Sequence, residues 1–452
     1  MHYNFNSVYI INKIKIVQKY DFFESVYIRM NTIGIIAEFN PFHNGHLHLI
    51  DKCSKHLNAD KCVVIMSGDF VQRGAPSVVD KFTKTKMALS CGADLVIELP
   101  LYYSLSSAEF FAQGAVSILD KTGVIDHLCF GSECGNVALL NDIAKLLNDE
   151  PLNYKSILNS NLKSGMSFAS AREAAILSCL KNGMLSNNEA CASDEESKEA
   201  EISSLLSNPN NILALEYIRA LLKRKSDIKP YTIVRSGEAY HSDKITELSS
   251  ASAIRKILLA PRLDIFEAIK ESVPESVLSL LEENVLSFAE TNSFSSLLFY
   301  KLCLEKSNGF TNYLDVNEDL SNKILAKLDS FYNFDDFCDK LKSKDIAYSR
   351  ISRALFHILL DMTDDKMNSY KEDDYTAYVR ILGMKKDSSD LVKKLKENSR
   401  IPVIGNLKEV NSLSLSEQQK SLFDETLLAS QIYSQLFRRK AINEFRQPLI
   451  IY

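Results

Sequence analysis

The first half of the chain alternates short apolar runs with amphipathic segments. Short uninterrupted apolar runs are typical of strands buried on both faces of a parallel sheet, and apolar spacings of three and four are typical of helices. We predict strands at 33–39, 62–68, 93–100, 124–131 and 231–235, and helices at 44–57, 79–91, 107–120 and 210–222. Strand–helix alternation with short connections predicts a doubly wound, Rossmann-like α/β fold with a parallel sheet.

The pattern changes after about residue 260, where helical spacing dominates. We predict helices at 275–288, 319–341, 348–361 and 415–440. Only 401–406 is a strand candidate in this half. The chain therefore divides, by prediction, into an α/β domain at 31–260 and a mostly α-helical C-terminal domain at 261–452.

Two segments fit neither pattern. Residues 1–30 are rich in Ile and aromatic side chains, but charged residues between 13 and 24 interrupt any signal-peptide core. We expect an N-terminal extension outside the core. Residues 184–205 are rich in Ser, Asn and Glu, so we expect an acidic inserted loop or a frayed helix that adds nothing to the core.

The composition is that of an ordinary globular protein. The 452 residues are 46% apolar and 25% charged, which argues against a disordered, collagen-like or coiled-coil chain. No run approaches the roughly 18 apolar residues of a membrane-spanning helix. The nine cysteines include no CxxC pair, so they predict neither a zinc site nor a disulfide framework. We expect reduced thiols in a cytoplasmic protein.

The formal net charge of −5 predicts no general attraction to nucleic acid, but this charge is unevenly distributed. Segment 185–204 carries six acidic residues and one lysine, which equals the imbalance of the whole chain. The remainder is electrically neutral, with basic clusters at 385–386, 393–396 and 438–440. Such clusters can bind a phosphate backbone, although a solvated helix face is the alternative interpretation of each.

The clearest chemistry lies in His43-Asn44-Gly45-His46, which follows the first predicted strand and opens the first predicted helix. A helix N-terminus presents unpaired N–H groups and a partial positive charge, which suit phosphate. Gly45 lets the backbone approach a phosphate closely. Two imidazoles three residues apart can point into one cleft, where each donor to a transition state is worth roughly 3–4 kcal/mol.

This motif has two other interpretations. An HxGH quartet recurs by chance, and His43, His46 and His48 could instead bind a metal as H-x-x-H-x-H. No helical or hairpin spacing aligns those three imidazoles. The strand before the motif and the helix after it favour phosphate binding, with His48 on the helix surface.

A second candidate site is SSASAIRK at 249–256. Ser249 or Ser250 can cap a helix, and Ser252 and Arg255 fall on one helical face. Hydroxyl groups, a helix N-terminus and a guanidinium fork together form a phosphate clamp. A capped surface helix is the alternative, and the presence of the HxGH motif favours the clamp.

Together these motifs resemble the HIGH superfamily of nucleotidyltransferases, and within it the tRNA(Met) cytidine acetate ligase family. The matching segments are EFNPFHNGH (38–46), SGDFVQRGAPSVVDKFTKTKMAL (67–89), GADLVIELP (92–100), FGSE (130–133), PNNILALEYIRAL (209–221) and SSASAIRK (249–256). Weaker similarity at 348–360 and 375–383 extends the resemblance over essentially 31–452.

The resemblance implies a ligase that works in two steps. Acetate is activated by ATP as acetyl-adenylate with release of pyrophosphate, and the acetyl group then passes to the wobble cytidine of elongator tRNA(Met) to give N4-acetylcytidine. Residues 31–260 are expected to be the catalytic domain and 261–452 the tRNA-binding domain. Mg²⁺ is expected to accompany ATP.

The resemblance also implies the site residues. The catalytic set is His43, His46 and Arg255. ATP is expected along Ile36, Ala37, Glu38, Phe39, Asn40, Pro41, Phe42, His43, Asn44, Gly45, His46, Leu47, His48 and Leu49, with Gly131, Asn210, Arg235 and Ser252 completing its site. A one-residue shift would replace Asn210 by Asn211, and a surface salt bridge is the alternative role for Arg235.

Further side chains are candidates for contacts with substrate or tRNA. They are Gln72, Arg73, Lys81, Arg350, Arg353, Lys385 and Lys386. A carboxylate nucleophile needs no general base, so the first step depends on positioning and charge neutralisation. Glu38 could accept a proton in the second step or could serve a structural role.

Two rival functions stay open. The chain could be an adenylyltransferase of a small metabolite, which predicts full activity without RNA. It could also be a non-catalytic nucleotide- or RNA-binding protein, although the presence of both His43 and His46 disfavours a decayed site.

Overall fold

The computed structural model describes residues 30–181, 195–235, 249–343, 346–437 and 443–452. The expected N-terminal extension up to residue 29 and the basic cluster at 438–440 lie outside these ranges. The strands are β1 (Thr32–Ala37), β2 (Lys61–Ser67), β3 (Phe70–Val71), β4 (Ala75–Pro76), β5 (Leu95–Leu99), β6 (His127–Ser132), β7 (Lys229–Val234), β8 (Val379–Met384), β9 (Val403–Ile404) and β10 (Ile450–Ile451).

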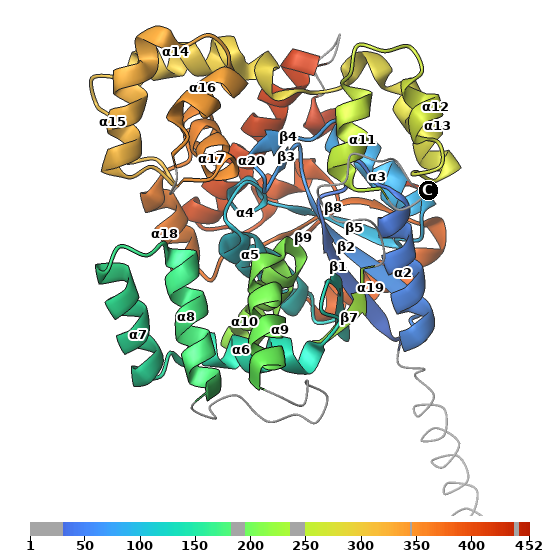
Figure 1. The fold of residues 1–452 in the computed structure, drawn as a ribbon. Helices are drawn as coiled ribbons and strands as arrows, with labels where there is room; N and C mark the ends of the chain where they lie inside the picture. The colour runs from blue at the N-terminus through green and yellow to red at the C-terminus, as the bar shows by residue number, and fades with distance from the viewer. Residues whose placement is uncertain (1–29, 182–194, 236–248, 344–345, 438–442) are drawn as a thin grey trace, which may run out of the picture.

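The α-helices cover both faces of the central sheet (Figure 1). They are α2 (Asn44–Leu57), α3 (Lys81–Ser90), α4 (Leu101–Ser104), α5 (Ala108–Thr122), α6 (Val137–Asp149), α7 (Leu152–Lys163), α8 (Phe168–Lys181), α9 (Glu195–Ser207), α10 (Pro209–Arg224), α11 (Ala251–Leu258), α12 (Ile265–Ile269), α13 (Glu275–Glu283), α14 (Ser295–Glu305), α15 (Glu318–Lys327), α16 (Phe334–Leu341), α17 (Tyr348–Leu359), α18 (Asp364–Glu372), α19 (Ser389–Asn398) and α20 (Glu417–Phe437). Among the described helices, none is long and apolar enough to cross a membrane.

The central sheet has the strand order β10-β8-β5-β2-β1-β6-β7, with β9 paired to β8. The pairs β5–β2, β2–β1, β1–β6 and β6–β7 are parallel, and β8 runs antiparallel to β5. The chain proceeds from β1 to β2 and β5 on one side and then returns to place β6 on the other side of β1. The prediction of a doubly wound α/β fold is therefore confirmed, and the topological switch point lies at the carboxyl ends of β1 and β6.

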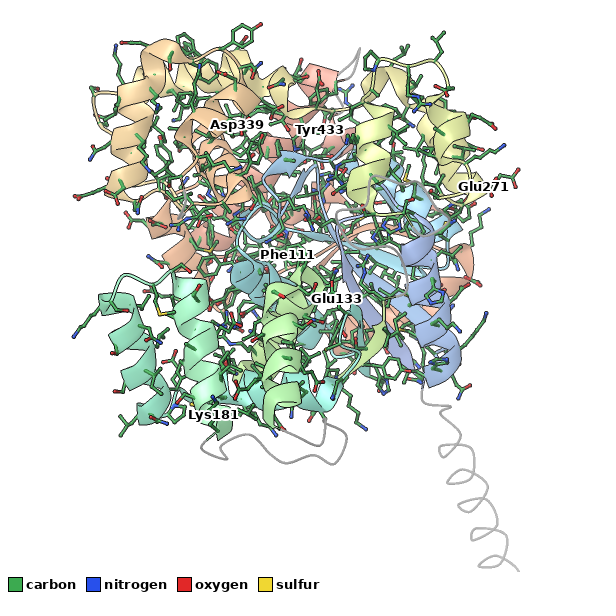
Figure 2. All side chains as sticks on the ribbon, viewed as in Figure 1. Phe111, Glu133, Lys181, Glu271, Asp339 and Tyr433 are labelled. Carbon is green, nitrogen blue, oxygen red and sulfur yellow. The ribbon has the colours of Figure 1, made fainter. Side chains whose placement is uncertain are left out.

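Side chains fill the space between the sheet and the helices on both faces (Figure 2). Alternate strand residues point to opposite faces, so that Ile33 and Ile35 join a core with α2, α3 and α11. Ile36 and Val63 join the other core, which includes α5, α6, α10 and the C-terminal helices. Because both faces of these strands are buried, their sequences are continuous apolar runs.

The described part of the second half contributes three strands, whereas we expected at most one. The candidate at 401–406 is confirmed as β9, but β8 was missed although five of its six residues are buried. Arg380 interrupts its apolar run and is neutralised by Glu98 of β5, a partner far away in the sequence. The predicted boundary at 260 thus does not coincide with an edge of the sheet.

The expectation of an acidic loop without core contacts is wrong for its second part. Residues 182–194 lie outside the described ranges, but α9 begins at Glu195 and packs against α8 and α10. Ile202 and Leu205 of α9 are buried in the core shared with α10. Together with the half-buried Leu206, these two side chains attach an otherwise mostly polar helix to the core.

Candidate active site

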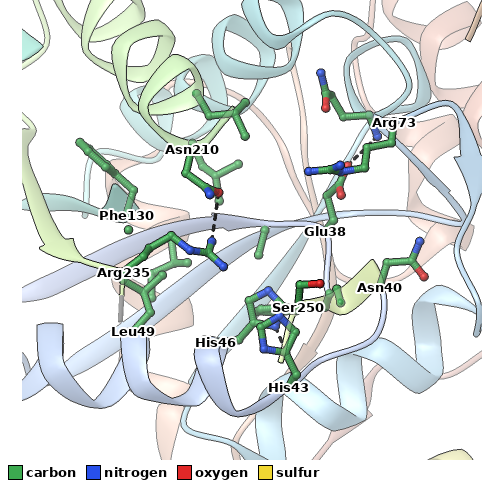
Figure 3. A pocket seen from close by; sticks show the side chains of 18 of the residues that line it. Glu38, Asn40, His43, His46, Leu49, Arg73, Phe130, Asn210, Arg235 and Ser250 are labelled. Atoms are coloured by element: carbon green, nitrogen blue, oxygen red, sulfur yellow. Dashed lines mark hydrogen bonds between the residues drawn. The ribbon is translucent and has the colours of Figure 1, made fainter. Parts of the chain in front are cut away.

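A cleft opens at the carboxyl ends of β1 and β6, where this fold class binds ligands (Figure 3). It is bounded by the start of α2, the start of α10 and the start of α11. From the expected ATP segment, Ile36, Ala37, Glu38, Phe39, Asn40, His43, His46 and Leu49 line it. Gly45 and His48 line an adjoining hollow, whereas Pro41, Phe42, Asn44 and Leu47 line neither.

The two motif histidines cap the helix that they open. His43 Nδ1 accepts a hydrogen bond from the backbone N–H of Gly45 at 3.0 Å, and His46 Nδ1 accepts one from the N–H of His43 at 3.2 Å. An accepting Nδ1 leaves the proton of a neutral imidazole on Nε2. The ring centroids lie 3.8 Å apart, and both rings line the cleft. The motif therefore offers two Nε2–H donors side by side.

Burial keeps these imidazoles neutral. Burial first, and then the charges of Arg235 and Arg255, lower the pKa of His43 from 6.5 to about 3. Burial, His43 and Arg235 hold the pKa of His46 well below its usual value. At neutral pH both side chains can donate to an anion without carrying a charge of their own.

The backbone of the motif is arranged differently from our expectation. The N–H of Asn44 donates to the carbonyl of Ser272 at 3.0 Å, and the N–H of Gly45 is taken by His43, so these groups at the start of α2 already have partners. A Cβ at Gly45 would lie 2.8 Å from Cε1 of His43. Glycine is therefore required here by the histidine cap, and the donors that face the cleft belong to side chains.

The second motif lines the cleft next to the HxGH motif (Figure 3). Ser250, and not Ser249, is the N-cap of α11, with its Oγ accepting from the N–H of Ala253 at 3.3 Å. Arg255 donates to the carbonyl of Asn40 at 2.6 Å and to Oγ of Ser252 at 3.1 Å. The predicted Ser252–Arg255 pair thus forms and binds the HxGH loop. Burial lowers the pKa of Arg255 to about 10, so the guanidinium stays charged at neutral pH.

Arg235 follows β7 and lies on the third side of the cleft, beside Asn210 (Figure 3). Its Nη1 donates to Oδ1 of Asn210 at 3.0 Å, and Asn210 in turn donates to Oε1 of Glu133 at 2.6 Å. A Cβ at Gly131 would lie 2.9 Å from Cγ of Arg235, so glycine leaves room for this arginine. Asn211 is buried and binds the backbone N–H groups of 133–134, which leaves Asn210 as the cleft residue.

Gln72 and Arg73 reach the cleft on the loop between β3 and β4. The N–H of Gln72 donates to Oε1 of Glu38 at 2.7 Å, which attaches this loop to the end of β1. Arg353 donates to the carbonyl of Gln72 at 3.4 Å and pairs with Asp315 at 3.1 Å. Arg353 is therefore a buried support of the loop and not a surface contact for RNA.

The other candidates lie away from the cleft. Lys81 is wholly buried and pairs with Glu98 at 2.7 Å, so the prediction that it contacts substrate or RNA is wrong. Lys385 and Lys386 follow β8, which runs antiparallel to β5, and they lie at the opposite end of the sheet. Arg350 is exposed near the start of α17 and stays a candidate for RNA contact.

No metal centre replaces this interpretation. Within the described residues, no three His, Cys, Asp or Glu side chains are arranged to hold a metal ion. The structure therefore gives the alternative of a His43–His46–His48 metal site no support. The Nδ1 atoms of His43 and His46 are already occupied by backbone N–H groups.

An apolar part of the cleft wall was missed by sequence reasoning. It comprises Phe111, Phe130, Leu213 and Tyr217. Phe130 and Tyr217 have ring centroids 5.8 Å apart, and such rings suit the face of a purine base. In the sequence these residues have the spacing of ordinary core positions, so nothing local distinguishes them.

Comparison with known proteins agrees with this geometry. The family model of the HIGH nucleotidyl transferases matches residues 30–447. Proteins named tRNA(Met) cytidine acetate ligase are 40% identical in Clostridium botulinum, over 93% of this chain and 99% of theirs, and 36% identical in Fervidobacterium nodosum, over the same shares. Thermotoga maritima TmcAL bound with alpha-thio ATP superposes with a TM-score of 0.84 at 27% identity, covering 93% of this chain and 99% of that one. The chain belongs to the tRNA(Met) cytidine acetate ligase family of the HIGH nucleotidyl transferases.

Proposed function

We propose that this protein is an ATP-dependent ligase that activates acetate as acetyl-adenylate and acetylates the wobble cytidine of elongator tRNA(Met). One observation carries the proposal. The Nε2–H donors of His43 and His46 and the guanidinium groups of Arg235 and Arg255 converge on one cleft at the switch point of the sheet. Four donors around one anion-sized space suit a triphosphate.

In the first step a carboxylate oxygen of acetate attacks the α-phosphorus of ATP. The new P–O bond replaces the bond to the β-phosphate, and pyrophosphate leaves with the bonding electrons. His43 and His46 donate hydrogen bonds to oxygens that gain negative charge, and Arg255 neutralises charge beside them. The apolar wall with Phe130 and Tyr217 receives the adenine.

In the second step the exocyclic N4 amine of cytidine attacks the acetyl carbonyl. The C–N bond forms as the C–O bond to AMP breaks, and one proton leaves the nitrogen. Glu38 lines the cleft, but its Oε1 already binds the N–H of Gln72, which favours a structural role. Gln72 and Arg73 line the cleft on a loop, where their amide and guanidinium groups suit contacts with the incoming nucleotide.

The cleft does not fit a resident Mg²⁺ ion. Among the described lining residues Glu38 is the only carboxylate, and the neighbouring charges are positive. Oxygen ligands are what Mg²⁺ requires, so the ion, where it takes part, enters on the phosphates of ATP. The described residues that line the cleft contribute no coordination shell of their own.

tRNA is the partner for the surface around the cleft entrance and the second half of the chain. Arg350 is exposed on α17, the helix that also supports the Gln72–Arg73 loop through Arg353. A bound tRNA at α17 therefore lies next to the loop that faces the adenylate. A tRNA substrate also places the protein in the cytoplasm.

The test is incubation of the protein with ATP, labelled acetate and elongator tRNA(Met), followed by nucleoside analysis. We expect labelled N4-acetylcytidine at the wobble position and none when ATP or acetate is omitted. Absence of the modified nucleoside, with an active control enzyme, contradicts the proposal. AMP formation with a different small acid and no tRNA product would favour the metabolite adenylyltransferase instead.

A further inference from the structure

Lys84 is a wholly buried cation whose ammonium group binds only backbone carbonyls among its hydrogen-bond acceptors. It lies in α3, and its Nζ donates to the carbonyl oxygens of Glu38 at 3.0 Å, Ser67 at 2.8 Å and Gly68 at 2.6 Å. An ammonium group has three N–H donors. Each of them therefore has one acceptor, and the geometry of the three carbonyls is set by one side chain.

These carbonyls belong to the two chain segments that build the cleft. Glu38 follows β1 and begins the loop to His43, whereas Ser67 and Gly68 end β2 and begin the segment that carries Gln72. The Glu38 carboxylate adds a second tie by accepting from the N–H of Gln72 at 2.7 Å. Lys84 therefore connects the HxGH loop to the Gln72–Arg73 loop at their origins.

The neighbouring lysines show that this arrangement is specific. Lys81, one turn earlier and equally buried, pairs with carboxylates of Glu98 and Glu444 at 2.7 and 2.9 Å. Lys86 is exposed. The hydrogen-bond acceptors of Lys84 are all neutral, and burial lowers its pKa although carboxylates nearby oppose that effect, so a charge here costs free energy that an apolar side chain would not. We therefore infer that the fold needs the three hydrogen bonds from Lys84 to these carbonyls.

We propose that Lys84 is a positioning residue of the adenylation site, which fixes the HxGH loop and the Gln72–Arg73 loop relative to each other. The inference rests on the proposed function, because adenylation is the reaction it serves. Lys84 touches no substrate. It acts through the backbone of Glu38 on His43 and His46, and through Gly68 on the loop that presents Arg73.

The kinetic test compares Lys84→Met, Lys84→Arg and the surface control Lys86→Met in acetate-dependent AMP formation. Displacement of reacting groups by about 1 Å costs on the order of 100-fold in rate, so we expect such a fall in kcat for Lys84→Met. Lys84→Arg keeps several N–H donors and should recover most of that loss. Lys86→Met should match the wild type. A wild-type kcat for Lys84→Met would overturn the proposal.

The dependence of kcat on pH distinguishes a positioning role of Lys84 from a purely structural one. Burial lowers the pKa of Lys84 to about 8, against the opposing charges of Asp69, Glu38, Asp80 and Glu98. A neutral amine has two N–H donors for three carbonyls. We expect wild-type kcat to fall above about pH 8 and the fall to move to higher pH in Lys84→Arg. An unchanged alkaline limb in Lys84→Arg contradicts the proposal.

This loss should occur without unfolding. Because the folded-state pKa lies below the unfolded value, the unfolded chain binds more protons between these two pKa values, and this group adds stability as the pH rises. Circular dichroism at each pH separates the two effects. If Lys84→Met does not fold, the comparison of wild type with Lys84→Arg still decides the question.

Failure of the proposed function can be distinguished from failure of this inference. If the wild type forms no AMP, the adenylation proposal fails, and Lys84 is then judged by hydrogen–deuterium exchange of the 68–74 amides. We expect faster exchange in Lys84→Met and wild-type exchange in Lys84→Arg. Exchange that is unchanged in Lys84→Met overturns the positioning role.

Discussion

Two groups of positively charged side chains in this molecule differ in their partners. In the interior next to β5 and β8, Lys81 and Arg380 form ion pairs with Glu98 and Glu444. Around the cleft, the hydrogen bonds of Arg235 and Arg255 go instead to an asparagine amide, a backbone carbonyl and a serine hydroxyl. One group of cations is neutralised within the fold, and the other retains charge for a ligand.

The pKa values follow this difference. Burial lowers the pKa values of both interior cations, but Glu98 and Glu444 outweigh that effect and raise the pKa values of Lys81 and Arg380. In the cleft burial prevails for Arg255 and lowers its pKa to about 10, whereas Arg235 is exposed. Positive charge that lines a cleft without a complete set of ion pairs is typical of a functional site, whereas a complete ion-pair network is typical of a structural one.

Breaking the interior network should have the largest effect, and it should be on stability. Glu98→Ala removes one of the two carboxylates that Lys81 and Arg380 share, and removal of one partner of a buried pair costs about 3–5 kcal/mol. Urea denaturation measures the change in the free energy of unfolding. The exposed pair of Glu397 with Lys393 is the control, since Glu397→Ala should cost at most about 1 kcal/mol. Equal effects of the two substitutions would contradict the distinction.

Removing a cleft donor should affect activity and spare stability. In His46→Ala one Nε2–H donor is lost, and loss of a comparable transition-state donor lowers kcat about 100- to 1000-fold. Acetate-dependent AMP formation measures this, and thermal unfolding verifies the fold. His56→Ala, an exposed imidazole at the far end of α2, should leave the rate unchanged. Wild-type turnover in His46→Ala would exclude the imidazole from the reaction.

A smaller loss is expected when the donor is displaced and not removed. In Gly45→Ala the new methyl group meets the His43 ring at 2.8 Å and must push it aside. We expect kcat to fall roughly 10- to 100-fold, by analogy with other displacements of reacting groups. Gly405→Ala is the matched control, because a Cβ there meets nothing within 4 Å. If both variants react at the same rate, the histidine cap does not set the geometry.

The smallest expected effect concerns the pH dependence of the reaction, in which we expect no titration of His43. With a folded pKa of about 3, His43 binds fewer protons than in the unfolded chain at pH values between 3 and 6.5, so it stays neutral there. We therefore expect kcat/KM to be flat from about pH 5.5 to 7.5, with no acid limb near 6.5. Stability from this group falls as the pH drops below 6.5. An acid limb near 6.5 that disappears in the His43 variant would show that a protonated imidazole is inhibitory.

Sequence reasoning succeeded where the signal was local. The strand 33–39 and the helix 44–57 appear as β1 and α2 because a buried apolar run and a helical spacing are visible in a short window. His43, His46 and Arg255, which the structure brings to one cleft, could be singled out because their motifs stand at element boundaries. The cap formed by Ser250 is equally local.

What failed depends on partners far away in the sequence. Strand β8 contains Arg380, and an arginine does not look like a buried strand residue in the sequence. Its burial is explained only by the ion pair with Glu98 of β5. Lys81 and Lys84 look like surface lysines of an amphipathic helix, and their burial depends on carboxylates and carbonyls of other elements. The apolar wall with Phe130 and Tyr217 is indistinguishable from core until the cleft is assembled.

The most direct test of the account is exchange of labelled pyrophosphate into ATP in the absence of tRNA. If the cleft cations hold the triphosphate for attack by acetate, wild-type protein catalyses exchange only when acetate is present. His46→Ala and Arg255→Met should lose it, and Glu397→Ala should retain it. Acetate-independent exchange, or full exchange in both cleft variants, would contradict the assignment of this cleft as the adenylation site.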